Sequence, residues 1–146
     1  MPITLNPNIR SLIMKYNQFK TVDASISFYP SLVNLDISSN RLETLPGKVF
    51  INQHMLDDLN LSDNDIDEVS EEVFTGLKRL TKLNMSKNKV KLLQNRSFQS
   101  LQILEFLDLS ENKIRTVEDE SFINLMNLKV LKLGDNNLKT VPSQAL

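Results

Sequence analysis

The chain has 146 residues, 40% of them hydrophobic and 24% charged, which is enough for one domain with a sizeable core. Its 17 basic and 18 acidic residues give a net charge of −1, which argues against a nucleic-acid partner. No apolar run reaches the roughly 18 residues of a membrane span, so we expect no insertion of this segment into a bilayer. The absence of cysteine excludes thiol catalysis, thiolate metal ligands and disulfides, and we expect no cofactor.

A pattern of about 24 residues repeats along almost the whole chain. Asparagine recurs at spacings of 23, 24, 24, 24 and 24 residues, at Asn17, Asn40, Asn64, Asn88, Asn112 and Asn136. Aliphatic residues or a phenylalanine stand at fixed positions around each of these asparagines, from eight residues before it to five after it. Ten residues after it come Phe50, Phe74, Phe98, Phe122 and finally Leu146, whereas the first repeat has Ser27 there. Agreement at this many positions indicates a stack of structural repeats.

The pattern divides the chain into repeats at about 9–31, 32–55, 56–79, 80–103, 104–127 and 128–146, the last one incomplete. Residues 1–8 are interpreted as the tail of a preceding unit or an N-terminal edge, with Ile3 and Leu5 facing the core. We therefore expect an internal fragment of a longer solenoid. Because a solenoid needs polar caps on its terminal repeats, the uncapped C-terminal edge is predicted to self-associate.

Elementary geometry predicts the same architecture. Each Leu-x-Leu step alternates with period two, which is typical of a short strand with its leucines on one face. Single repeats bury too little apolar surface to fold alone, so strands from successive repeats should pair in parallel over a shared core. We expect an α/β repeat solenoid, with a concave parallel sheet of about six strands and an irregular or short-helical convex side. The asparagine amides are expected to pair with backbone groups where the chain turns, and the Phe column is expected to lie in the core.

The segments Leu56–Ile66 and Leu104–Ile114 resemble the LxxLxLxxNxL pattern of leucine-rich-repeat proteins. The 24-residue length and the trailing Phe are similar to the typical class in Toll-like, Slit-like and chaoptin-like extracellular repeat domains. This resemblance implies a non-catalytic protein-recognition domain, part of a secreted or membrane-anchored receptor or adhesion protein at the cell surface. The alternative is a cytoplasmic leucine-rich-repeat scaffold that docks signalling proteins, which the absence of cysteine and of a signal sequence favours.

Two features that could suggest other chemistry have simpler explanations. His54 is the single histidine and lies in a connector, where the repeat places no nucleophile or second histidine, so it is interpreted as a loop residue. Asp63, Asp65 and Asp67 have the spacing of the first calcium-loop ligands, but Glu68 and Phe74 occupy the positions where such a loop needs Gly and Glu. We expect neither an enzyme nor a metal site.

Charges differ sharply between neighbouring repeats. Repeat three is acidic, whereas residues 80–103 contain no acid. Because residues 24 apart lie side by side in a stack, the sequence predicts the lateral pairs Asp58–Lys82, Asp63–Lys87, Asp65–Lys89 and Asp67–Lys91, with Glu111 on the far side of Lys87. These pairs are interpreted as a register-fixing ladder or, alternatively, as a bipolar stripe that docks a charged partner.

The concave strand positions are the expected binding surface, and its unusual members lie toward the C-terminal end. Phe106 and Val130 are neighbours in one column and are predicted to be exposed anchors, unless a long side chain such as Lys82 or Lys132 covers them. The full candidate set is Lys82, Glu105, Phe106, Asp108, Val130 and Lys132. Tyr16 and Ile13 form a second apolar spot near the N-terminus.

Three Asn-x-Ser sequons occur, at Asn60, Asn84 and Asn95. The first two arise from the repeat pattern, whereas Asn95 lies on a connector and is the better candidate for N-glycosylation in a secreted protein. Glycans at Asn60 or Asn84 would cover the middle of the concave face. A ligand would then be directed toward Phe106 and Val130.

Overall fold

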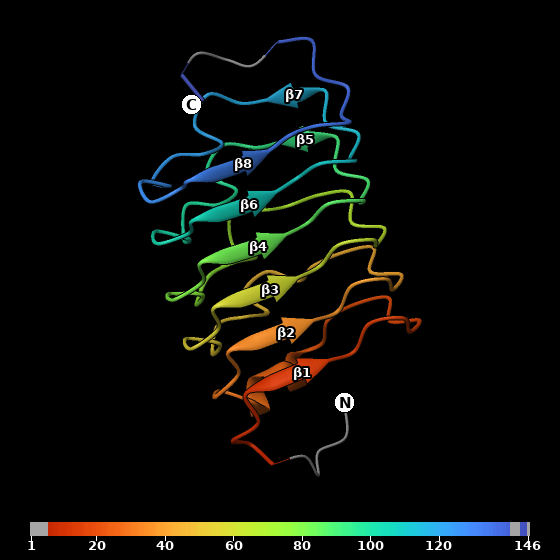
Figure 1. Ribbon diagram of the computed structural model, residues 1–146, viewed down its shortest axis with the longest axis vertical. Coiled ribbons are helices and arrows are strands. Elements are labelled where there is room, and N and C mark those ends of the chain that lie inside the picture. The colour runs from red at the N-terminus through yellow and green to blue at the C-terminus, as the bar shows by residue number, and fades with distance from the viewer. Residues whose placement is uncertain (1–5, 141–143, 146) are drawn as a thin grey trace.

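The computed structural model describes residues 6–140 and 144–145, and within them the chain winds as a parallel solenoid (Figure 1). Its main sheet has six parallel strands in the order β1-β2-β3-β4-β6-β8. Their bounds are β1 Ser11–Ile13, β2 Asn34–Asp36, β3 Asp58–Asn60, β4 Lys82–Asn84, β6 Phe106–Asp108 and β8 Val130–Lys132. The predicted leucine-rich-repeat horseshoe is confirmed. The predictions for Ile3, Leu5 and Leu146 lie outside the described residues.

The central leucine of each strand fixes the register of the sheet. Leu35 pairs with Leu59, Leu59 with Leu83 and Leu83 with Leu107, one repeat apart each time. These leucines are almost fully buried, while the residues on either side of them point to the opposite face. A slip of one residue would turn every leucine out of the core, so the column specifies the pairing strongly.

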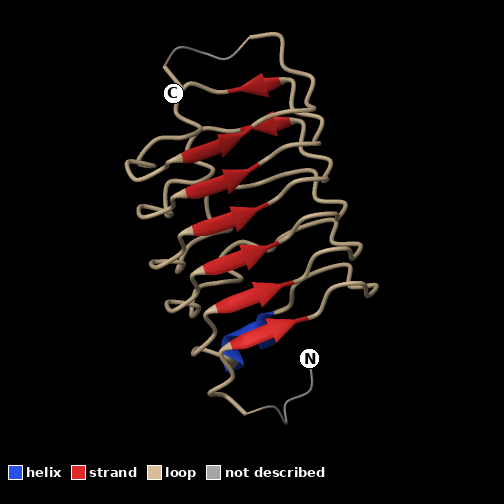
Figure 2. Cartoon of the chain, viewed as in Figure 1, coloured by secondary structure: helices blue, strands red, loops and turns tan. Residues whose placement is uncertain are grey.

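The opposite side of the solenoid has little regular structure (Figure 2). It contains the 3₁₀ helix η1 (Ala24–Phe28) and a two-stranded sheet of β5 (Leu92–Leu93) and β7 (Thr116–Val117). The side chain of Asp23 caps η1 by accepting a 2.7 Å hydrogen bond from the Ser25 backbone N–H. Turns, irregular chain and an isolated bridge between Thr21 and Thr44 make up the rest of the described convex side. None of the described helices has the length and hydropathy of a membrane span.

Three members of the phenylalanine column, Phe74, Phe98 and Phe122, form an aromatic stack in the core. The ring centroids of Phe74 and Phe98 are 5.8 Å apart, and those of Phe98 and Phe122 are 6.1 Å apart. In the first repeat, where the column has Ser27, the neighbouring Ile26 is fully buried instead and Phe28 is exposed. The two outermost described repeats bury their leucines only in part, because they have a packing neighbour on one side only.

Candidate recognition surface

The recurring asparagines form a ladder that hydrogen-bonds the turns at which each strand leaves the sheet. The ladder consists of Asn17, Asn40, Asn64, Asn88, Asn112 and Asn136. Asn88 is buried, and its Nδ2 donates to the carbonyls of Leu61, Met85 and Ser86 at 3.0, 3.1 and 3.2 Å. Its Oδ1 accepts the Ile66 N–H at 3.1 Å. Asn40, Asn64, Asn112 and Asn136 make the same type of bonds to their own and the preceding repeat.

The residue before each ladder asparagine has a left-handed backbone. The φ angles are 60° at Tyr16, 53° at Ser39, 56° at Asp63, 56° at Lys87, 54° at Glu111 and 54° at Asp135. This conformation turns the chain away from the strand and leaves carbonyl groups that need a donor from outside the strand ladder. The asparagine amide supplies that donor, so hydrogen bonds between neighbouring repeats hold this edge of the concave surface.

The polar side chains at the third position of the central strands form hydrogen bonds within their own repeats. Asp36, Asn60, Asn84 and Asp108 each accept a hydrogen bond at 2.9–3.1 Å from the N–H of the serine two residues later. These short side chains therefore bend toward their own repeat. A partner would meet a flat polar surface here, and larger side chains must supply any anchor.

Phe106, Val130, Asp108 and Lys132 form one cluster on β6 and β8. Phe106 lies directly beside Val130 in the sheet register, and Asp108 lies beside Lys132. The Lys132 ammonium lies 5.2 Å from the centre of the Phe106 ring and 3.4 Å from Asp108 Oδ2. One lysine thus makes both a cation–π contact and an ion pair.

This geometry corrects two expectations about the cluster. Phe106 is half-buried rather than exposed, because Lys132 covers part of its ring; Val130, at 41% exposure, is exposed as predicted. Asp108, expected to be an available binding group, is only 7% exposed, because Ser110 and Lys132 enclose its carboxylate. Glu105 is half-buried and pairs with Lys129 at 2.9 Å, whereas Lys82 is exposed.

Asp58 and Asp108 on this face have opposite electrostatic surroundings. Burial acts to raise the pKa of Asp108, but hydrogen bonds from Ser110 and Lys132 outweigh it and hold that pKa below its ordinary value. Burial raises the pKa of Asp58, and the charges of Asp57 and Asp36 add to this effect against the opposing attraction of Lys82. The ionised form of Asp58 is therefore disfavoured in its position on β3.

Neutralising these two aspartates is expected to change stability in opposite directions at pH 7. Asp108→Asn should lower the free energy of unfolding and Asp58→Asn should raise it, each by less than about 1 kcal/mol. Asparagine occurs naturally in both columns, at Asn60 and Asn84 with the same serine hydrogen bond as Asp108, and at Asn34 beside Asp58, so each substitution isolates the charge.

The effect of pH follows from the direction of each shift. The stability from ionised Asp108 is present above the unfolded-state pKa and is lost as pH falls through the lower folded-state pKa. The penalty from ionised Asp58 is absent below the unfolded-state pKa and is complete once pH exceeds the raised folded-state pKa. Urea unfolding of both variants and the parent from pH 7 down to acid should show both differences shrinking, and effects of the same sign at pH 7 would contradict this assignment.

The predicted ladder of ion pairs forms only in part. Asp65 and Lys89 form an ion pair at 2.7 Å, and Lys87 reaches Glu111 at 4.0 Å. Among the described residues, the expected pairs Asp58–Lys82, Asp63–Lys87 and Asp67–Lys91 are not within ion-pair distance. The expectation was wrong for these three because exposed pairs gain roughly 0–1 kcal/mol, too little to fix long side chains.

The sequons differ in their structural setting. Asn60 and Asn84 are half-buried on the concave face, and Asn95 is exposed on a connector. Asn95 Oδ1 accepts the Glu120 N–H at 2.9 Å, and its own backbone N–H donates to Glu118. A glycan on Nδ2 would leave both of these bonds possible, so use of this sequon stays a prediction that is compatible with the fold.

Three buried polar side chains escaped the sequence analysis. Ser97 and Ser121 stand just before Phe98 and Phe122, and each hydroxyl hydrogen-bonds two backbone carbonyls. Gln53 is fully buried and donates to Ile26 O at 2.8 Å. The signal was a serine or glutamine in a column that is aliphatic in other repeats, where Val73 and Leu77 stand. These groups connect neighbouring repeats and do not face a partner.

The remaining candidates occupy ordinary positions. His54 is exposed, with Nδ1 3.0 Å from the Gly76 carbonyl oxygen. Across residues 6–140 and 144–145, no group of three or more acidic or histidine side chains could hold a metal ion. Phe122, Leu125 and Leu128 line a hollow at the last described turn. Self-association through that end stays a prediction.

A parallel solenoid with a polar concave sheet is the architecture of a repeat domain that recognises other molecules. The leucine rich repeat family model matches residues 30–90, 55–114 and 104–146, which together span most of the chain. The chain therefore belongs to the leucine-rich-repeat family.

The fold is similar to that of a solved structure of a longer protein. The TLR13 chain in the crystal structure of a TLR13–ssRNA13 complex matches with a TM-score of 0.72 and 24% identity. The match covers 93% of this chain and 23% of the TLR13 chain, so this chain spans less than a quarter of that protein. A search of curated proteins gave no match. At this level of identity the likeness establishes the fold alone.

Proposed function

We propose that this chain is a rigid protein-recognition segment of a longer secreted or membrane-anchored receptor or adhesion protein. Its partner binds the concave face around β6 and β8. The observation that carries this proposal is the cluster of Phe106, Val130 and Lys132, which places an apolar anchor beside a cation. Around it, the short polar side chains of the sheet are already hydrogen-bonded within their own repeats. Aromatic and cationic side chains on a preorganised surface are the usual origin of strong binding energy between proteins.

A protein partner fits this face better than RNA does. TLR13 is found with ssRNA13 in the solved complex, but here Asp36 on β2, Asp58 on β3 and Asp57 just before β3 lie along the same sheet. Their negative charge would repel a phosphate backbone that followed the sheet. The apolar contact offered by Phe106 and Val130 suits a protein surface, on which a side chain can pack against both.

The test compares two double variants that remove similar apolar surface. Phe106→Ser with Val130→Ser alters the concave cluster, and Ile51→Ser with Ile123→Ser alters the convex connectors, where these residues are 40% and 39% exposed. The purified chain, presented as a tetramer, is applied to an array of secreted and cell-surface proteins. Relative to the unsubstituted chain, the concave variant should bind the partner at least roughly tenfold more weakly, and the convex variant should bind it with similar affinity.

Equal loss in both variants, or no effect of the concave one, would contradict the proposed surface. The compartment is tested separately, by reading the parent transcript on both sides of this segment. An upstream signal sequence and a downstream membrane span would support an ectodomain. Flanks without them would instead place the protein with cytoplasmic scaffolds.

A further inference from the structure

A row of positive side chains lies on the flank of the solenoid just past the ladder asparagines. The local sequences Lys89-Val90-Lys91 and Lys113-Ile114-Arg115 alternate, and Val90 and Ile114 are fully buried. The period of two therefore sends both cations of each pair outward. We call this surface the basic flank, and it consists of Lys89, Lys91, Lys113, Arg115 and Lys139.

Backbone hydrogen bonds place these cations in adjacent layers. The Arg115 N–H donates to the Lys91 carbonyl at 2.9 Å, and the Lys113 N–H donates to the Val90 carbonyl at 2.9 Å. The Asn137 N–H continues the series by donating to Ile114 at 2.9 Å, which brings Lys139 into line above Arg115. The positive charges thus follow the long axis of the solenoid, one layer per repeat.

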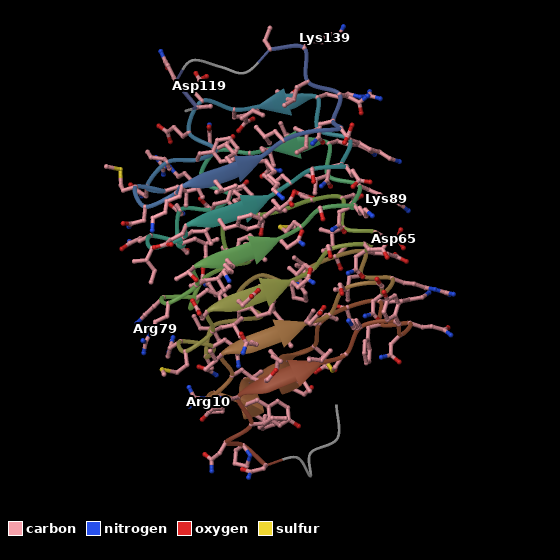
Figure 3. All side chains as sticks on the ribbon, viewed as in Figure 1. Arg10, Asp65, Arg79, Lys89, Asp119 and Lys139 are labelled. Atoms are coloured by element: carbon pink, nitrogen blue, oxygen red, sulfur yellow. The ribbon has the colours of Figure 1, made fainter. Side chains whose placement is uncertain are left out.

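Most of these cations form no ion pair with a residue that the structure describes. Lys89 pairs with Asp65, but Lys91, Lys113, Arg115 and Lys139 have no ion-pair partner among the residues that the structure describes. All five are exposed. Figure 3 shows Asp65 and Lys89 together on the side toward which the strand arrows point, while Arg10 and Arg79 lie on the opposite flank. Like charges this close together repel one another, so an anion that bridged them would be stabilised.

We propose that the basic flank binds a linear sulfated polysaccharide that runs along the solenoid axis. Val90 and Ile114, which separate the cations of each pair in the sequence, are fully buried, and no aromatic residue occurs within 87–91, 111–115 or 135–139. A single-stranded nucleic acid would need aromatic platforms for its bases, and a protein partner would need an apolar anchor. Cations repeated at regular intervals suit a polysaccharide whose anionic groups project from an extended sugar backbone.

The acidic side chains of Asp65, Asp67 and Glu43 set one end of this site. Together with Lys89, Lys91 and Lys113 they line a hollow of about 290 Å³, where the surface changes from positive to negative. An anionic polymer would be repelled beyond this point. The site therefore extends from Lys89 toward Lys139 and does not continue into the second and third repeats.

The experiment measures binding of a heparin oligosaccharide to the purified chain by calorimetry at several salt concentrations. The triple variant Lys91→Gln/Lys113→Gln/Arg115→Gln should weaken binding by on the order of tenfold or more and reduce its salt dependence. The control Arg10→Gln/Lys78→Gln/Arg79→Gln removes the same charge from the other flank and should leave binding within about twofold. The variant Asp65→Asn/Asp67→Asn should tighten binding several-fold, because it removes repulsion and frees Lys89.

Competitors of matched charge decide the ligand class. Unsulfated hyaluronan should compete poorly. Tighter binding of poly(U) RNA or of poly-glutamate than of heparin, with the same loss in the triple variant, would overturn the sulfated polysaccharide in favour of that polymer. Equal losses in the two triple variants would show that net charge alone attracts heparin, which would overturn the site.

Discussion

Replacing Asn88 with alanine is expected to lower the free energy of unfolding by about 3–5 kcal/mol. The side chain is buried and satisfies three carbonyls and one N–H of two successive repeats. Alanine would leave these backbone groups without a partner in a region that water does not reach, at a cost of about 1–3 kcal/mol for each group that finds no other. The loss would also weaken the coupling between the third and fourth repeats.

Asn17 provides the matched control for this substitution. It stands in the same column, but it is exposed, and among the described residues its Nδ2 donates to Met14 and Lys15 of its own repeat. Asn17→Ala should therefore cost less than about 1 kcal/mol. Urea unfolding followed by circular dichroism measures both variants. Similar losses at the two positions would show that the ladder hydrogen bonds between repeats contribute little.

The fold was predictable because residues with the same structural role recur at the same position of each repeat. Leu59, Leu83 and Leu107 recur in register, so the pairing of the strands followed directly from the 24-residue spacing. A period in the sequence fixes which residues lie side by side, and burial of the aliphatic columns fixes which face they occupy. The same reasoning placed Phe74 and Phe98 in the core, where their rings stack.

The state of the candidate site was not predictable to the same degree. The columns put Phe106 beside Val130, but nothing in the spacing indicates that Lys132 bends over the ring or that Asp108 becomes enclosed. These outcomes depend on the rotamers of long side chains, which differ by only about 1 kcal/mol. For the same reason Lys87 lies nearer to Glu111 than to its predicted partner Asp63.

Replacing Gly76 with alanine is expected to destabilise the chain by roughly 3–5 kcal/mol. Gly76 has φ of +102°, and a Cβ there would lie 2.5 Å from the Phe50 carbonyl oxygen and 2.6 Å from Ile51 Cα. Both neighbours are backbone atoms of the preceding repeat, so no side-chain rotation can relieve the clash. The second and third repeats would have to separate locally, which would disturb the burial of Phe50 and Phe74 beneath this turn.

Gly134→Ala is the control, because a Cβ at that position meets nothing within 4 Å. It should leave stability within about 0.5 kcal/mol of the parent. Thermal unfolding compares the two variants, and hydrogen exchange locates the damage. Protection should fall first in β2 and β3 in the Gly76 variant and less in β6, because contacts in a solenoid are confined to neighbouring repeats. A uniform loss along the sheet, or a Gly76 variant as stable as the Gly134 variant, would mean that the close approach at this turn does not couple the two repeats.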